Sequence, residues 1–218
     1  MNIPNALTLL RIFFVPVLVA ALVLEHRTVT VGGFAFANHQ VALAVFLAAA
    51  FTDLLDGYLA RRWNQITTVG MLLDPVADKL LVSAALISLV QVQRVPAWMA
   101  VLIVGREFAV SGLRAIAASE GFTIQASELG KTKTVTQVVA ISLVLAAMDL
   151  PELQPWANMA LWGTMVFALV SAADYFRVFW KGIDANVKAR RRSELLQLEK
   201  ERRREEMRAA VAARKAKG

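Results

Sequence analysis

Long apolar stretches alternate with short polar breaks along the chain up to about residue 180. Each stretch approaches the roughly 20 residues that a helix needs to cross the hydrocarbon core of a bilayer. The pattern predicts six spanning helices, over residues 5–24, 40–60, 69–92, 95–118, 132–149 and 156–180. The predicted fold class is therefore an all-α polytopic membrane bundle. For the first stretch, a cleaved signal peptide is the alternative, because Arg11 precedes an apolar run with small residues near Ala20.

The end of the chain has a different character. The formal net charge is +7, but residues 182–218 hold twelve Lys/Arg against six Asp/Glu, whereas residues 1–181 hold twelve against eleven. The tail contains no proline and is rich in residues that favour helices, so it is predicted to be at least partly helical. We therefore expect a membrane domain over residues 1–181 and a basic cytoplasmic tail over residues 182–218.

Two basic runs in the tail, Arg190–Arg192 and Arg202–Arg204, suit anionic lipid headgroups, at about 1 kcal/mol per residue near the surface. A solvated charged helix that helps to fix topology is the alternative. No aromatic residues interleave these arginines, so nucleic acid is not an expected partner.

Composition excludes further classes of protein and of functional site. With 57% hydrophobic and 19% charged residues, the chain does not resemble an ordinary soluble domain. The absence of cysteine excludes disulfides, thiolate metal sites and a cysteine nucleophile.

Basic residues are placed unevenly between the polar breaks, which predicts orientation. One set of loops, together with the tail, carries most of the lysines and arginines, whereas the opposite set carries Arg27, Arg94 and the acidic stretch 149–152. An even number of spans with both termini in the cytoplasm satisfies this bias.

Four aspartates lie in or beside the second and third apolar stretches. Asp53 and Asp56 are three residues apart, and Asp74 and Asp78 are four apart, so each pair shares one helical face. A charge at bilayer depth costs about 2.5–3.5 kcal/mol on insertion scales, so such side chains face a cavity or a partner. If the polar residues 61–65 form a short turn, the two helices are antiparallel neighbours and the four carboxylates converge near the cytoplasmic surface.

Four carboxylates that close together cannot all stay ionised without a cation. Their hard oxygen atoms favour Mg²⁺ or Mn²⁺, ions that often bridge protein carboxylates and substrate phosphates. Gly57, Ala60 and Gly70 leave space beside the acids for close packing or a ligand. The alternative is a set of structural ion pairs between the acids and Arg61, Arg62 and Lys79.

The pattern Asp53-x-x-Asp56-Gly57-x-x-Ala60-Arg61, eight residues, Gly70-x-x-x-Asp74-x-x-x-Asp78 resembles the signature of the CDP-alcohol phosphatidyltransferase family at every fixed position. The resemblance implies a six-helix membrane bundle, usually dimeric, with a metal site in a cavity open to the cytoplasm. It also implies that the hydroxyl of an acceptor alcohol displaces CMP from a CDP-linked lipid.

The same resemblance assigns roles to individual residues. The metal ligands would be Asp53, Asp56, Asp74 and Asp78, and together they would hold two ions, Mg²⁺ or Mn²⁺. Asp78 would also be the general base. The residues against the CDP-lipid would be Asp53, Asp56, Gly57, Ala60, Arg61 and Gly70.

A second polar island interrupts the fourth apolar stretch. Its members are Arg106, Glu107, Ser111 and Arg114, and Lys131 and Lys133 follow at the start of the fifth stretch. Arg106 and Arg114 are eight residues apart, about 80° around a helix, so they can reach one site. Cations beside an anionic metal site indicate a second substrate that carries phosphate. The alternative is a set of topology-determining residues with an ion pair from Glu107 to an arginine.

Several further stretches resemble the bacterial members of the family whose acceptor is glycerol 3-phosphate, namely residues 2–11, 60–65, 73–79, 106–107 and 130–134. The resemblance covers residues 2–180, without the tail and the glycine-containing loop 25–39. It implies CDP-diacylglycerol and glycerol 3-phosphate as substrates and the bacterial inner membrane as the location. The acceptor phosphate would bind Arg106, Arg114, Lys131 and Lys133, with supporting roles for Asn5, Thr8, Arg11, Glu107 and Ser111.

Two alternatives stay open. Another family member could use phosphatidylglycerol or an inositol phosphate as acceptor. Outside the family, a non-catalytic ion carrier would also place carboxylates in a membrane.

Overall fold

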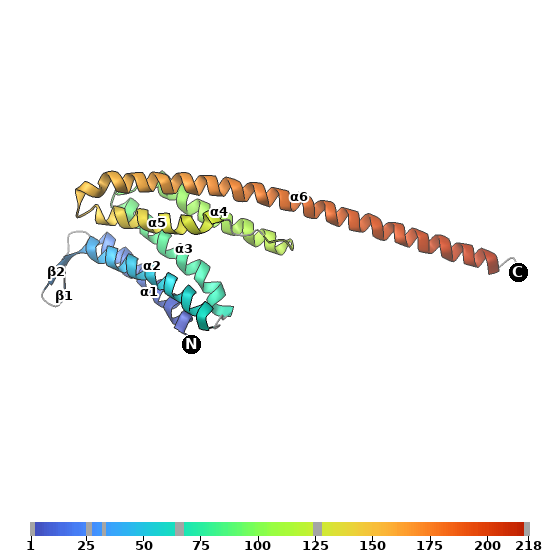
Figure 1. Ribbon diagram of the computed structural model, residues 1–218, viewed down its shortest axis with the longest axis horizontal. Coiled ribbons are helices and arrows are strands. Elements are labelled where there is room, and N and C mark those ends of the chain that lie inside the picture. Colours follow the sequence, from blue (N-terminus) through green and yellow to red (C-terminus); the bar gives the residue numbers. More distant parts are fainter. Residues whose placement is uncertain (1–2, 25–27, 32–33, 64–67, 124–127, 216–218) are drawn as a thin grey trace. The chain divides into compact units, whose positions relative to one another are not determined.

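The computed structural model describes residues 3–24, 28–31, 34–63, 68–123 and 128–215. Long helices dominate these residues (Figure 1). They are α1 (Ile3–Val23), α2 (Asn38–Trp63), α3 (Thr68–Gln91), α4 (Ala97–Ser119), α5 (Glu128–Ala146) and α6 (Gln154–Lys215), with a short 3₁₀ helix η1 (Pro151–Leu153) before α6. A helix therefore lies over each of the six predicted stretches.

The helix ends differ from the prediction in three places. Helix α2 continues to Trp63, so Arg61 and Arg62 belong to its last turn, and the turn predicted over 61–65 is wrong for these positions. Helix α5 begins at Glu128, so Lys131 and Lys133 lie in a helix and not at its mouth. Helix α6 runs on to Lys215, which confirms the helical tail. Charged residues do not end a helix; they only end its apolar stretch.

A small antiparallel hairpin was not predicted. Strand β1 (Thr28–Val31) pairs with β2 (Phe34–Ala37), with Thr28 opposite Ala37 and Val31 opposite Phe34. The sequence carries the signal, because β-branched and aromatic residues flank a Gly-Gly pair. The all-α prediction therefore holds for the long elements and misses this hairpin.

The contacts divide the chain into two compact units, Met1–Ala109 with Ala126–Ala172, and Val110–Gln125 with Ala173–Gly218. This division reflects which residues pack together. It does not test the predicted boundary between a membrane domain and a tail at residue 181, which stays a prediction.

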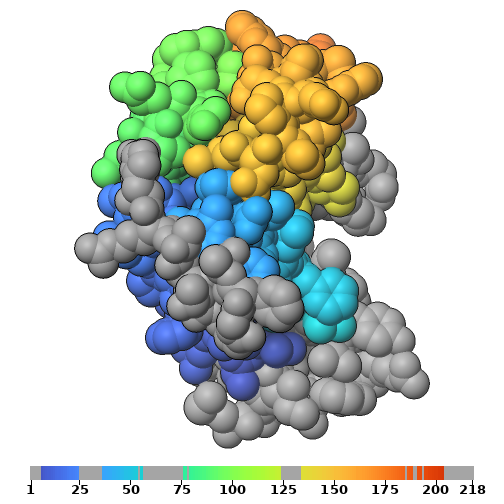
Figure 2. Space-filling view, turned by 90° about the vertical axis from the view of Figure 1, so that its left-hand side faces the viewer, coloured from blue at the N-terminus to red at the C-terminus, as the bar shows by residue number. Residues whose placement is uncertain are grey.

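In the first unit, α1 packs against α2 and α3, and α2 packs against α5. The blue and cyan side chains of α1 and α2 lie together on the face in Figure 2. Small residues let these helices approach closely, which matters in a bilayer because packing, and not the hydrophobic effect, drives helix association there. Those with almost no exposed surface include Ala42, Ala49, Ala85, Ala140 and Ala157.

Two helical windows in the described residues are long and apolar enough to cross a membrane, Ala6–Val23 and Pro151–Lys188. Shorter apolar helical stretches cover Lys79–Gln91 and Thr134–Ala146. Large apolar side chains are also exposed on α4 and α6 of the first unit, namely Trp98, Val101, Phe108, Trp162 and Val166. An apolar outer face of this kind is typical of a surface that meets lipid or a partner.

The second unit has its own contacts between the end of α4 and α6. The Phe122 ring lies 6.3 Å from that of Phe179, and Asn186 donates a hydrogen bond to the backbone oxygen of Glu120. Gly182 faces the Phe122 ring so closely that an added Cβ would lie 2.5 Å from its Cε2 atom.

The Gly182→Ala variant is expected to melt at a lower temperature than the wild type. Phe122 must shift to admit the methyl group, and overpacking of this kind costs about 1–3 kcal/mol. The control is Gly163→Ala, because a Cβ at Gly163 meets nothing within 4 Å and alanine favours a helix. Thermal unfolding in detergent measures both variants. Equal melting temperatures for Gly182→Ala and the wild type would contradict the close contact.

Candidate functional site

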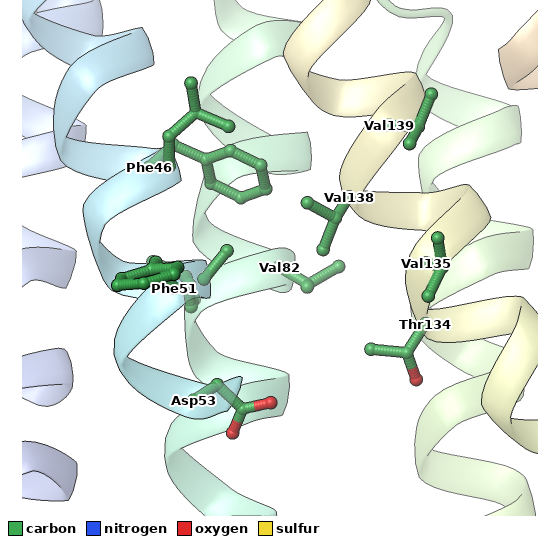
Figure 3. A pocket seen from close by; sticks show the side chains of 11 residues that line it. Phe46, Phe51, Asp53, Val82, Thr134, Val135, Val138 and Val139 are labelled. Atoms are coloured by element: carbon green, nitrogen blue, oxygen red, sulfur yellow. The ribbon is translucent and has the colours of Figure 1, made fainter. Parts of the chain in front are cut away.

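Asp53 lies at one end of a cavity of about 260 Å³ that is bounded by α2, α3 and α5. Its walls are otherwise almost entirely apolar, with Phe46, Leu47, Ala50, Phe51, Leu81, Val82, Thr134, Val135, Val138 and Val139. Figure 3 shows Asp53 and Thr134 at the same end of this space, with the phenylalanine and valine side chains above them. The cavity therefore combines an apolar channel with a carboxylate at its polar end.

The other three acids occupy the helices that the sequence predicts. Asp56 follows Asp53 by about one turn in α2, and Asp74 and Asp78 are about one turn apart in α3. Helices α2 and α3 contact each other. The side chains of these three acids lie outside the described residues, so the convergence of all four carboxylates stays a prediction. The same holds for the side-chain roles of Ala60 and Arg61 and the close approach expected at Gly57 and Gly70.

Within the described part of the chain, no three His, Cys, Asp or Glu side chains form a metal cluster. Asp53 is the one predicted ligand whose side chain is described. Its carboxylate reaches the cavity and is 35% exposed, as a group that takes a further ligand must be. The donor chemistry fits a hard divalent cation, because carboxylate oxygens are the ligands that Mg²⁺ and Mn²⁺ prefer.

Arg11 of α1 forms an ion pair with Asp53, with 2.7 Å between Nη1 of Arg11 and Oδ1 of Asp53. The Arg11 side chain has no exposed surface, and Thr8, one turn earlier, is also buried. Thr8 and Arg11 therefore face the bundle interior. The Asn5 side chain lies outside the described residues.

Arg106 is buried in the first unit between α4 and α6. It donates hydrogen bonds to the hydroxyl of Ser171 and, over 3.3 Å, to the carboxylate of Glu107. The ion pair that the alternative interpretation predicted from Glu107 is thus present, and a role of Arg106 toward a phosphate stays a prediction.

Arg114 belongs to the second unit, where it donates a hydrogen bond to the hydroxyl of Tyr175. The guanidinium carbon lies 4.9 Å from the centroid of the Tyr175 ring, which is within the range of a cation–π contact. Tyr175 is buried, whereas Arg114 is exposed. Tyr175 therefore supports a guanidinium that is accessible to a ligand.

Neither hydroxyl partner was predicted. Ser171 and Tyr175 lie one turn apart in α6, and with Asp174 they form a polar island in the last apolar stretch. Polar residues within this apolar stretch were the sequence feature that could have indicated the two hydroxyl partners. Because Arg106 and Arg114 belong to different units, their action on one site stays a prediction. Ser111 is partly buried on α4, and the Lys131 and Lys133 side chains lie outside the described residues.

A further pair joins the first turn of α2 to the connection after α5. His39 donates a hydrogen bond to Asp149. Burial alone would raise the pKa of Asp149, but hydrogen bonds from His39 and Gln40 and the charge of His39 together hold that pKa below its usual value. The pair thus ties two distant parts of the first unit together.

Thermal stability is expected to fall as the pH drops through the acid range. A carboxyl whose pKa is lower in the folded state stabilises the fold above its unfolded pKa of about 3.9, and this contribution is lost as the pH falls through the folded pKa. Melting temperatures of wild type and Asp149→Asn, measured in detergent between about pH 3 and 6, test this. The variant should show the weaker pH dependence, and identical profiles would contradict the assignment.

Residues 1–170 match the family model for CDP-alcohol phosphatidyltransferase. A Bacillus subtilis protein named CDP-diacylglycerol–glycerol-3-phosphate 3-phosphatidyltransferase is 43% identical over 188 residues, which cover 84% of this chain and 97% of that protein.

Proteins of the same name from Pseudomonas fluorescens and Rickettsia felis are similar as well. The first is 37% identical over 83% of this chain and 91% of its own length, and the second 31% identical over 81% and 94%. The match includes both motif helices, α2 and α3, which carry the four acids. The resemblance seen in the motif is thereby confirmed, and the chain belongs to the CDP-alcohol phosphatidyltransferase family.

Proposed function

We propose that this membrane protein transfers the phosphatidyl group from CDP-diacylglycerol to glycerol 3-phosphate, giving phosphatidylglycerophosphate and CMP. The observation that carries the proposal is Asp53 of the family motif at the polar end of an apolar cavity. Relatives that cover nearly the whole membrane part of the chain bear the name of this activity. The protein would thus be a bacterial phosphatidylglycerophosphate synthase.

The cavity suits the donor lipid. An acyl chain entering laterally between α2 and α5 would meet Phe46, Phe51 and Val138, while the diphosphate lies toward Asp53. Gly57, Ala60, Arg61 and Gly70 would line the CDP part, since they adjoin the acids in sequence. Apolar walls with a charged end match a lipid with a charged head.

Asp53, Asp56, Asp74 and Asp78 would hold two Mg²⁺ or Mn²⁺ ions. When bound, such ions neutralise the diphosphate and stabilise the leaving CMP. Asp78 would accept the proton of the attacking hydroxyl, which requires hydrogen-bond reach to that group. A bond then forms between the acceptor oxygen and the lipid phosphorus, and the bond from that phosphorus to the oxygen of CMP breaks.

The acceptor phosphate would bind Arg106, Arg114, Lys131 and Lys133. The exposed, tyrosine-supported guanidinium of Arg114 is the best supported of these contacts. Arginine binds phosphate well because its planar fork donates two parallel hydrogen bonds.

All six long helices would span the membrane, with both termini in the cytoplasm and the protein in the bacterial inner membrane as a homodimer. Charges in α2, α3 and α4 lower the hydropathy of these helices, and the two long apolar windows found among the described residues lie at the first and last helices. Charges that face an internal site do not prevent a span.

The function is tested with purified protein in detergent, CDP-diacylglycerol, Mg²⁺ or Mn²⁺ and labelled glycerol 3-phosphate. Metal-dependent transfer of label into lipid with release of CMP is expected, and Asp78→Asn should lose it. Release of CMP only with phosphatidylglycerol or an inositol phosphate would show that the protein uses a different acceptor alcohol. Cation flux in proteoliposomes without any release of CMP would favour the ion carrier.

A further inference from the structure

Arg11 is a charged side chain near the middle of α1, in a mostly apolar sequence, and none of its surface is exposed. A buried guanidinium is costly unless an opposite charge and hydrogen bonds compensate for its lost hydration. The opposite charge here is Asp53, one of the acids of the family motif. The pair therefore links α1, which carries none of the four motif acids, to the proposed metal site.

We propose that Arg11 is a positioning residue that holds the Asp53 carboxylate in the orientation a divalent cation needs. The inference rests on the proposed function, because it concerns the same site. In this role the Arg11 guanidinium orients a metal ligand and does not contact the substrate.

The geometry supports positioning. The 2.7 Å separation of Nη1 and Oδ1 makes this a close ion pair, which holds the carboxylate toward α1. A carboxylate has about four lone-pair directions on its two oxygens, so one that binds a guanidinium through Oδ1 can still bind a cation. Helix α1 packs against both α2 and α3, so Arg11 is anchored to the two helices that carry the acids.

The unequal exposure of the partners separates this role from a purely structural ion pair. Arg11 is fully enclosed, whereas the Asp53 side chain is 35% exposed and lines the cavity. A pair that served packing alone would have no reason to turn its carboxylate toward a cavity. Partners behind a metal ligand usually orient it, and their loss weakens metal binding.

The experiment measures Mn²⁺ binding to the purified full-length protein by electron paramagnetic resonance, without substrates. Arg11→Gln should raise the Kd for Mn²⁺ about 10–100-fold. Arg11→Lys should recover part of the loss, because lysine keeps the charge without the planar fork. The control is Arg94→Gln, which removes an exposed arginine of the first unit that belongs to no proposed site, and its Kd should equal that of the wild type.

An unchanged or lower Kd in Arg11→Gln would overturn the inference, since Arg11 would then be indifferent to the cation or compete with it. If Arg11→Gln does not fold, Arg11→Lys decides, and a wild-type Kd in that variant overturns the inference. Failure of the wild type to transfer label, with Mn²⁺ binding and its Arg11 dependence intact, would overturn only the proposed reaction. Failure of the wild type to bind Mn²⁺ would overturn both.

Discussion

Asp74→Asn is expected to lose nearly all transfer of the phosphatidyl group. Asparagine keeps the shape of the side chain but removes a negative charge and one anionic oxygen from the proposed metal site. Metal ions contribute several kcal/mol to the stabilisation of charge in such reactions, so a loss of about 4 kcal/mol would lower the rate about a thousandfold. Initial rates of CMP release with Mg²⁺ and with Mn²⁺ measure the effect.

The matched control is Asp184→Asn, which removes an exposed carboxylate from α6 outside the motif. Its rate should equal that of the wild type, because a solvated acid on the tail has no part in the reaction. A wild-type rate for Asp74→Asn would rule out the reading of the four acids as ligands of two metal ions. Thermal unfolding of both variants in detergent shows whether a lost rate reflects lost structure.

The long elements follow from local properties of the chain, which is why the sequence predicts them. Each apolar stretch is long enough to be a helix in a bilayer, where backbone groups have no water to bind. The positions of Asp53 and Asp56 within one helix, and of Asp74 and Asp78 within the next, follow from the same stretches. Helical spacing alone places each pair on one face.

Side-chain partners could not be predicted, because they depend on how helices far apart in sequence pack. Arg11 meets Asp53 across 42 positions, and Arg114 meets Tyr175 across 61. Thr8 and Arg11 lie about one turn apart on α1, yet nothing in the sequence selects one acid as the partner of Arg11. The pair of His39 and Asp149 has the same origin. Local signals give the faces of helices, and only tertiary packing gives the contacts between them.

Arg114→Ala is expected to raise the KM for glycerol 3-phosphate with a smaller change in kcat. A hydrogen bond to a charged group contributes about 1.5–3 kcal/mol, which corresponds to a KM about 10–150-fold higher. A contact that holds the acceptor equally in the ground and transition states changes KM and leaves kcat nearly unaltered. Initial rates over a series of acceptor concentrations, at saturating CDP-diacylglycerol, separate the two constants.

Tyr175→Phe distinguishes recognition of phosphate from a structural role of Arg114. The variant keeps the ring beneath the guanidinium and removes only the hydroxyl that accepts its hydrogen bond. If Arg114 binds the acceptor, a less restrained guanidinium should raise the acceptor KM by less than Arg114→Ala does, while the KM for CDP-diacylglycerol stays at the wild-type value. If both variants instead lower the melting temperature and leave the acceptor KM unchanged, the arginine serves the packing of α4 against α6, and the phosphate must bind elsewhere.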